Sequence, residues 1–192
     1  MSDINIRKGH NIGIAGIPSN EVIQGFKPKL VSIQPIDFRG IKPKLMVKEG
    51  DTVKVGSSLF YSKSNHEITW PSPGGGKVLK IQYGPRRTIE NIIIEIAEDE
   101  EIESFKAYRP AEIVGLNREV ILKTLLDGNI FPFIRQRPYN KVADPKDIPR
   151  DIFISGWNTA PLAVNVDVAL RRRLAPLQAL SLIHISEPTR PY

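Results

Sequence analysis

The stretch Val47-Lys-Glu-Gly-Asp-Thr-Val-Lys-Val-Gly-Ser-Ser-Leu-Phe60 decides the fold of the first half of this chain. It contains two sharp turn signals, at Glu49–Asp51 and at Gly56, each flanked by apolar residues. Glycine permits the positive φ angle that tight turns need, so the stretch predicts three short strands joined by two turns. A second turn leading into a strand, Trp70-Pro-Ser-Pro-Gly-Gly-Gly-Lys-Val78, follows it.

The same strand pattern extends outward from this stretch, from Ile4 to Glu98. Short apolar runs separated by glycine, proline and charged turns predict a compact all-β module. The runs are Leu30–Ile33, Leu45–Val47, Ser58–Tyr61, Val78–Ile81 and Asn91–Ile96. Together the two glycine-containing segments resemble the barrel-sandwich hybrid of biotinyl and lipoyl carrier domains, which is the fold expected for residues 1–100.

A carrier domain presents a modified lysine at a hairpin tip, and Lys63 is the lysine in the matching segment. It lacks the flanking residues of biotin and lipoyl carriers, and the segment with Asn65, His66 and Glu67 is expected to be too loose for a two-residue tip. The β module is therefore interpreted as an unmodified scaffold, and a carrier domain modified on Lys63 remains the alternative. Gly74–Gly76 leads into a strand rather than a helix, which argues against a phosphate-binding loop.

The pattern changes after the acidic run Glu98–Glu101. Asn117 is a helix N-cap signal, Gly128 is a C-cap signal, and apolar residues recur at helical spacing between them. Asp151–Ser155 is a candidate buried strand, and Ala160–Leu170 is a candidate helix. Helix, loop, strand and helix predict the start of an α/β domain over residues 101–179. The fold class is therefore α+β and multidomain.

The composition of this 192-residue chain excludes several kinds of site and function. It has no cysteine, which excludes thiolate metal sites, iron–sulfur ligands and a cysteine nucleophile within it. The two histidines before residue 180 have no ligand-spaced partner, so no metal site is predicted. No serine lies in a nucleophile-elbow context, and Asp37, Asp51 and Glu67 are interpreted as turn or surface carboxylates, so no catalytic residue is predicted. The net charge of +6 is spread without a basic stripe, which argues against nucleic-acid binding. No apolar run reaches the ~20 residues of a transmembrane helix.

The loop Arg135-Gln-Arg-Pro-Tyr-Asn-Lys141 is the densest cluster of cations and aromatic groups. Pro138 restricts its backbone and Tyr139 offers a flat face with a hydroxyl. Loops held on a packed scaffold are where binding residues tend to lie, so this loop is the predicted site.

The C-terminal segment Leu180-Ser-Leu-Ile-His-Ile-Ser-Glu-Pro-Thr-Arg190 reads as an in-frame translation of a transposase-type sequencing adapter. Residues 180–192 are therefore interpreted as a non-native tail. The expectation is that the remaining residues are the front of a longer protein.

Six segments in order resemble the A subunit of the bacterial sodium-translocating NADH:quinone oxidoreductase. They are Arg7–Gly9, Val47–Phe60, Pro71–Gly74, Gly84–Arg87, Phe133–Tyr139 and Ile152–Leu162. The resemblance implies a barrel-sandwich hybrid followed by a Rossmann-like domain related to the flavoprotein subunit of complex I, here truncated. It departs from the family at Gly74–Gly76, where the extra glycine predicts a longer or looser hairpin.

The resemblance also implies a function. The family's A subunit is peripheral on the cytoplasmic face of the inner membrane, beside the membrane-embedded B subunit, in a translocase that oxidises NADH, reduces ubiquinone and exports sodium. Flavins and iron centres lie in partner subunits, so no cofactor is expected in this chain, and the isolated chain is expected to be inactive. The family's quinone-proximal or subunit-interface segments match Asp37, Phe38, Arg135, Arg137, Pro138, Tyr139 and Lys141. The alternative in another class is the related electron-transport subunit that carries flavin and iron–sulfur clusters.

Overall fold

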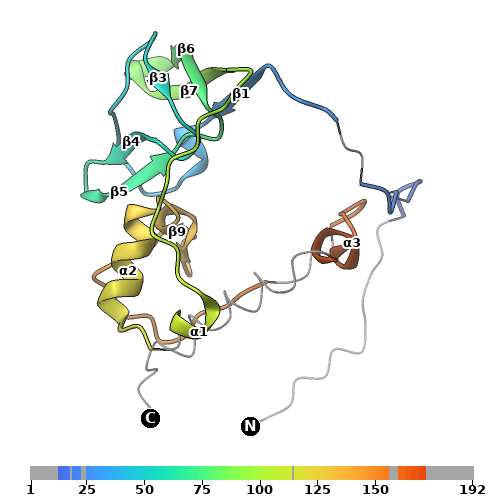
Figure 1. Cartoon of the computed structure of the whole chain (residues 1–192), viewed down its shortest axis with the longest axis vertical. Coiled ribbons are helices and arrows are strands. Elements are labelled where there is room, and N and C mark those ends of the chain that lie inside the picture. Colours follow the sequence, from blue (N-terminus) through green and yellow to red (C-terminus); the bar gives the residue numbers. More distant parts are fainter. Residues whose placement is uncertain (1–12, 18, 23–24, 114, 156–159, 172–192) are drawn as a thin grey trace.

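The computed structural model describes residues 13–17, 19–22, 25–113, 115–155 and 160–171. Its body is built from two antiparallel sheets (Figure 1). The first sheet has the order β1 (Leu30–Ile33), β7 (Ile89–Ile96), β6 (Gly76–Tyr83) and β3 (Thr52–Val53). The second sheet has the order β2 (Pro43–Leu45), β4 (Ser58–Ser62) and β5 (Asn65–Pro71). The β-rich module predicted from the glycine turns is therefore present.

The core lies between the two sheets. The first sheet contributes Val78, Ile92 and Ile94, and the second contributes Leu59, Phe60 and Trp70; each has an exposed fraction of 0%. Full burial of a side chain of this size stabilises the fold by about 1.5–3 kcal/mol. In β7 the fully buried Ile92 and Ile94 lie two residues apart, so they project to the same, inner face of the sheet.

Strand β5 corrects the prediction of a loose segment after Ser62. Ser62 pairs with Asn65, so only Lys63 and Ser64 form the tip of the β4–β5 hairpin. The Lys63 N–H donates to the Lys42 carbonyl at 2.9 Å, which fixes the tip against the chain that leads into β2. The sequence pattern suggests a loop here because the outward positions are polar, while the buried positions, Ile68 and Trp70, are few.

The glycine run between β5 and β6 is closely packed, not loose as the departure from the family pattern predicted. A Cβ atom on Gly74 would lie 2.9 Å from Val31 Cγ2, and one on Gly75 would lie 2.9 Å from the Glu101 carbonyl oxygen. A Cβ atom on Gly76 would overlap the Glu95 carbonyl oxygen. Each glycine is therefore required by a different close approach.

The acidic segment after β7 stays on the barrel. Val55 N–H donates to the Glu101 carbonyl at 2.8 Å, and Glu103 N–H donates to the Val55 carbonyl at 2.8 Å. Lys54 forms an exposed ion pair with Glu101 at 2.9 Å, and this hydrogen bond raises the pKa of the Lys54 ammonium. Residues 101–103 thus act as an extra edge segment beside the turn at Gly56.

The second part of the chain is anchored by helix α2 (Arg118–Asp127). Its ends confirm the sequence signals: the Asn117 side chain accepts from Val120 N–H, and Gly128 is the C-cap. The residue in the left-handed conformation is the following one, Asn129, with a φ of 55°. Asparagine is the usual non-glycine residue at such a helix end.

The buried Asn129 side chain joins this helix end to the barrel. Its amide nitrogen donates to the Gly56 carbonyl at 2.9 Å and to Ser58 Oγ at 3.0 Å. Its carbonyl oxygen accepts from Ser58 Oγ at 3.3 Å and from Thr69 Oγ1. One side chain therefore ties α2 to both β4 and β5.

The remaining elements are short. They are α1 (Pro110–Ile113), α3 (Val166–Leu170), β8 (Arg135–Gln136), β9 (Lys141–Val142) and the 3-10 turns η1 (Pro35–Asp37), η2 (Pro85–Arg87) and η3 (Phe131–Phe133). The helix expected over 160–170 is thus confined to its last five residues, capped by Asn165. No helix in the described part of the chain is long and apolar enough to cross a membrane.

The strand predicted at Asp151–Ser155 is not formed. None of the sheets in the described part of the chain includes these residues, and Phe153 is 88% exposed. Strand conformation depends on a pairing partner, and no described strand lies beside this segment to supply one.

The close approach at Gly76 predicts a large stability effect. Gly76→Ala should lower the free energy of unfolding by about 1–3 kcal/mol, because the new methyl group forces β6 and β7 apart. Gly115→Ala is the matched control, since its Cβ would meet only the Glu112 carbonyl oxygen, at 3.8 Å. Urea denaturation followed by circular dichroism measures both. Equal stability of the two variants would contradict the packing account.

The Asn129 network predicts a second effect on stability. Asn129→Ala should lower the free energy of unfolding by about 1–3 kcal/mol more than Asn140→Ala, because it leaves buried polar groups without partners. Asn140 is a matched control, since it also has a left-handed backbone (φ 53°) and its side chain makes no hydrogen bond to the described residues. The same denaturation experiment compares them, and losses of equal size would show that only backbone strain matters.

Candidate functional site

The first predicted segment is positioned by β1 and η1. After β1 the chain turns at the buried Pro35 and continues through Asp37 to Phe38. The Phe38 ring is half-buried and lies edge-on to Trp70, with ring centroids 5.3 Å apart. Asp37 is exposed.

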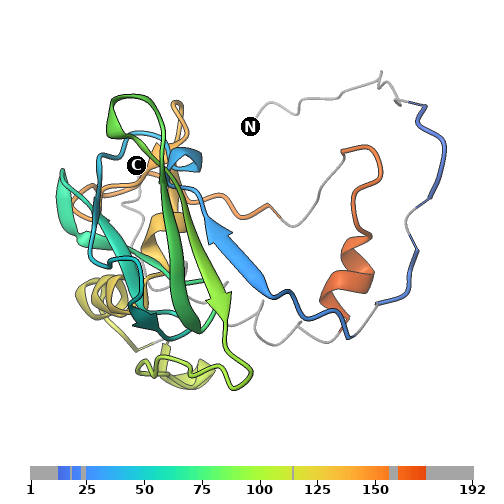
Figure 2. The same ribbon diagram turned by 90° about the horizontal axis from the view of Figure 1, so that it is seen from above.

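The second predicted segment reaches the same place from η3. Phe133 lies at the end of η3, and its ring centroid is 6.0 Å from that of Phe38. In the hairpin that follows, Val142 N–H donates to the Arg39 carbonyl at 3.2 Å. A Cβ atom on Gly40 would lie 3.2 Å from Lys141 Cβ. Segments 35–41 and 133–142 are therefore side by side, as Figure 2 shows for the blue η1 turn and the orange β8–β9 hairpin.

We give the name basic–aromatic face to a set of side chains on these two segments. It comprises Asp37, Phe38, Phe133, Arg135, Arg137, Pro138, Tyr139 and Lys141. Arg135, Arg137 and Lys141 are exposed, and none forms an ion pair with any of the residues described. Phe133 is 54% exposed and Tyr139 is 77% exposed. The face thus offers cations and flat apolar surface together.

The structure does not bring every predicted residue into contact. Phe38 is in ring contact with Trp70 and Phe133, whereas the Tyr139 ring contacts no other aromatic ring within the described chain. The backbones of the two segments therefore converge, while the Tyr139 ring faces solvent.

Sequence reasoning missed Trp70, which lies beneath this face. Its ring stacks on Phe60 with centroids 4.9 Å apart and an interplanar angle of 10°. Its exposed fraction is 0%, and its indole Nε1 finds no hydrogen-bond acceptor among the described residues. In the sequence, Trp70 is marked only as a large aromatic residue directly before a proline-rich turn. That position does not indicate which residues Trp70 contacts.

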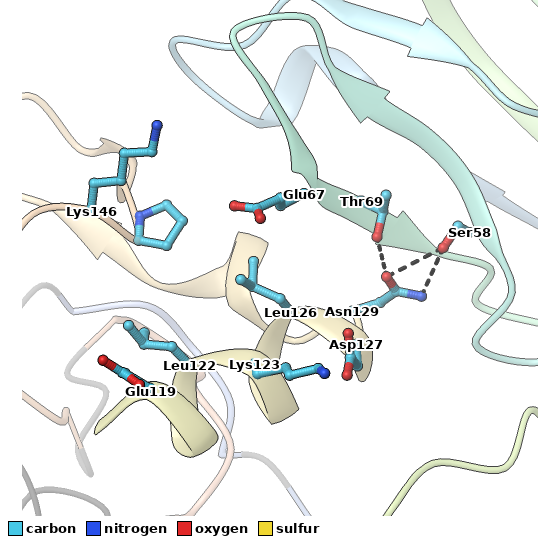
Figure 3. Close-up of a pocket in the computed structure, with 11 residues that line it drawn as sticks. Ser58, Glu67, Thr69, Glu119, Leu122, Lys123, Leu126, Asp127, Asn129 and Lys146 are labelled. Atoms are coloured by element: carbon cyan, nitrogen blue, oxygen red, sulfur yellow. Dashed lines mark hydrogen bonds between the residues drawn. The ribbon is translucent and has the colours of Figure 1, made fainter. Parts of the chain in front are cut away.

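A separate groove of about 620 Å³ lies between β5 and α2 (Figure 3). Its charged groups are mixed in sign, with Glu67, Glu119 and Asp127 against Lys123 and Lys146. Asn129 lines it, but both ends of that amide are already hydrogen-bonded to the barrel. None of the residues predicted for the site lines this groove. It shows no group that points to chemistry.

The glycine run Gly74–Gly76 and the potential metal-ligating side chains do not form binding sites in the described part of the chain. Gly74–Gly76 leads into strand β6 rather than into a helix N-terminus, so it lacks the helix end that binds a phosphate. Within the described residues, no cluster of three or more His, Cys, Asp or Glu side chains is placed to hold a metal ion.

Two family models match successive parts of the chain. The NqrA N-terminal barrel-sandwich hybrid domain matches residues 4–97, and the NqrA second alpha/beta domain matches residues 116–186. The second match extends into the segment interpreted as an adapter-derived tail. That interpretation stays a prediction, and the tail lies outside the described residues.

Most of this chain is similar in sequence to relatives named as the A subunit of a Na(+)-translocating NADH-quinone reductase. The one from Alcanivorax borkumensis is 33% identical over 88% of this chain and 38% of its own length. The one from Photorhabdus laumondii is 35% identical over 87% of this chain and 37% of its own length. The one from Vibrio alginolyticus is 32% identical over 94% of this chain and 41% of its own length.

The chain therefore spans about two fifths of the length of these curated relatives. The two domain matches follow each other in order and together cover most of the sequence. The chain belongs to the NqrA family, that of the A subunit of the Na(+)-translocating NADH-quinone reductase, and it carries that family's barrel-sandwich hybrid followed by its α/β domain.

Proposed function

We propose that this chain acts in a sodium-pumping respiratory complex that transfers electrons from NADH to ubiquinone and exports Na⁺. In this proposal it is the peripheral NqrA subunit, a component of a translocase that has no redox centre of its own. Support comes from its family and from relatives whose name is that of the complex. Flavins and iron centres are assigned to partner subunits, and NADH is used by the complex.

The basic–aromatic face is the part of the chain proposed to work in the ubiquinone-reducing step. The observation that carries this role is the convergence of segments 35–41 and 133–142. A quinone site needs a flat apolar surface for the ring and donors for its carbonyl oxygens. Phe38 and Phe133 offer the surface, while Arg135, Arg137 and Lys141 offer donors without ion-pair partners among the described residues.

The same face suits a contact with a partner subunit. Exposed arginine and aromatic side chains on a rigid scaffold are typical of binding hot spots. We assign this contact to the membrane-embedded B subunit, on the cytoplasmic side of the inner membrane. A quinone held between the two proteins would satisfy both roles of the face.

Neutralising the face should impair the complex. A variant with Arg135→Gln, Arg137→Gln and Lys141→Gln should raise the KM for ubiquinone by about tenfold or release the chain from the complex, since hydrogen bonds to charged groups are among the stronger ones. A variant with Lys77→Gln, Lys80→Gln and Lys123→Gln removes the same charge from exposed positions elsewhere. Both are assayed as NADH:ubiquinone reductase activity and as recovery of the chain with the membrane complex. If the face variant matches the control in both assays, the face has neither role.

Membership of the complex has its own test. The affinity-tagged chain, expressed in its native cells, should recover a membrane assembly whose NADH:ubiquinone reductase activity is stimulated by Na⁺. The purified chain alone should oxidise no NADH in the presence of a short-chain ubiquinone, because its partners hold the redox centres. Recovery of the chain without any such activity, or NADH oxidation by the chain alone, would refute the proposed function.

A further inference from the structure

The indole N–H of Trp70 is a buried donor without an acceptor. Trp70 has an exposed fraction of 0%, and no acceptor among the described residues reaches Nε1. Leaving a buried donor unpaired costs about 1–3 kcal/mol, and the large majority of buried polar groups in native proteins are paired. An unpaired donor in the centre of the core therefore requires a physical explanation.

The walls around Trp70 are aromatic and differ in how firmly they are held. Phe60 stacks on the indole from β4, within the sheet, and is fully buried. Phe38 approaches edge-on from the connection between η1 and β2 and is half-buried. Since Phe38 lies in a loop and Phe60 in a paired strand, Phe38 is the side chain that can move away from Trp70.

The space that Phe38 covers adjoins the basic–aromatic face. Phe133 is next to Phe38 on the solvent side and is 54% exposed. Lys141 and Gly40 are adjacent, so the cationic hairpin borders the same position. A ligand that displaced Phe38 would therefore contact the indole below and the Phe133 ring beside it.

We infer that Trp70 Nε1–H donates a hydrogen bond to a carbonyl oxygen of a flat conjugated ring that enters where Phe38 now lies. An indole N–H is a donor only, so its partner must be an acceptor such as a carbonyl oxygen. Aromatic walls favour a flat ring, which packs edge-on or offset against them. A quinone head group has both properties, so this inference rests on the proposed function and specifies a binding residue for it.

A weak N–H···π contact with Phe38 is the competing explanation of the buried donor. The two explanations predict different stabilities when the N–H is removed from the ligand-free protein. If the N–H has no partner there, removing it should raise the melting temperature, because the cost of burying an unpaired donor is removed. If it is held by a ring, removing it should lower the melting temperature.

The test replaces Trp70 with 3-benzothienylalanine, in which sulfur takes the place of the N–H group at nearly constant shape. The same replacement at Trp157, which lies outside the described residues, is the matched control. Calorimetric titration with a short-chain ubiquinone measures affinity for the full chain, and thermal unfolding measures stability. We expect the Trp70 replacement to weaken binding about five- to tenfold, the range of a typical neutral hydrogen bond, and to raise the melting temperature, because an unpaired buried donor is removed.

Every other outcome would overturn either the role of Trp70 or the proposed quinone contact. Unchanged affinity at position 70, with binding intact in the unsubstituted chain, would overturn the role of Trp70 and leave the proposed function standing. A melting temperature that does not rise would show that the N–H is used in the free protein and would also overturn that role. Absence of quinone binding by the unsubstituted chain would overturn both this inference and the proposed quinone contact.

Discussion

Trp70 packs between two aromatic neighbours and so joins the two-sheet barrel to the loop beside it. Phe60 stacks on it from β4, and Phe38 meets its edge from the loop after η1. Such pairs contribute about 0.5–1.5 kcal/mol each beyond the area they bury. Because Phe38 also touches Phe133, this one cluster links the barrel, the η1 loop and the η3 turn that leads into β8. The position of the basic–aromatic face follows from that linkage.

Local signals in the sequence predicted much of the fold. Glycine at Gly50 and Gly56 marks backbone with φ values of 93° and 91°, which few other residues adopt. Asn117 and Gly128 marked the ends of α2 because caps are satisfied within a few residues of the chain. Two predictions were wrong in opposite directions: the segment that forms β5 was expected to be loose, and Asp151–Ser155 was expected to be a strand. Both errors arise because a strand forms only where another strand pairs with it. Ser62 pairs with Asn65 in the first case, whereas no described strand pairs with the second.

The candidate site was predictable only in part, for the same reason. The resemblance pointed to Asp37–Phe38 and to Arg135–Lys141, and composition alone drew attention to the second segment. That Gly40 lies against Lys141, and that Phe38 covers Trp70, follows from tertiary packing across long sequence separations. The absence of ion pairs for the three cations within the described chain is likewise a property of the folded surface. Chemistry at the face can therefore be argued only once its neighbours are known.

The most direct test of this account is to observe the aromatic contacts at Phe38 in solution. Nuclear Overhauser effects between assigned ring protons of the isotope-labelled chain report which rings are in contact. We expect effects from the Phe38 ring to both the Trp70 indole and the Phe133 ring, since both lie close to Phe38. A Phe38 ring that shows effects to neither would contradict the convergence of the two segments and, with it, the proposed site.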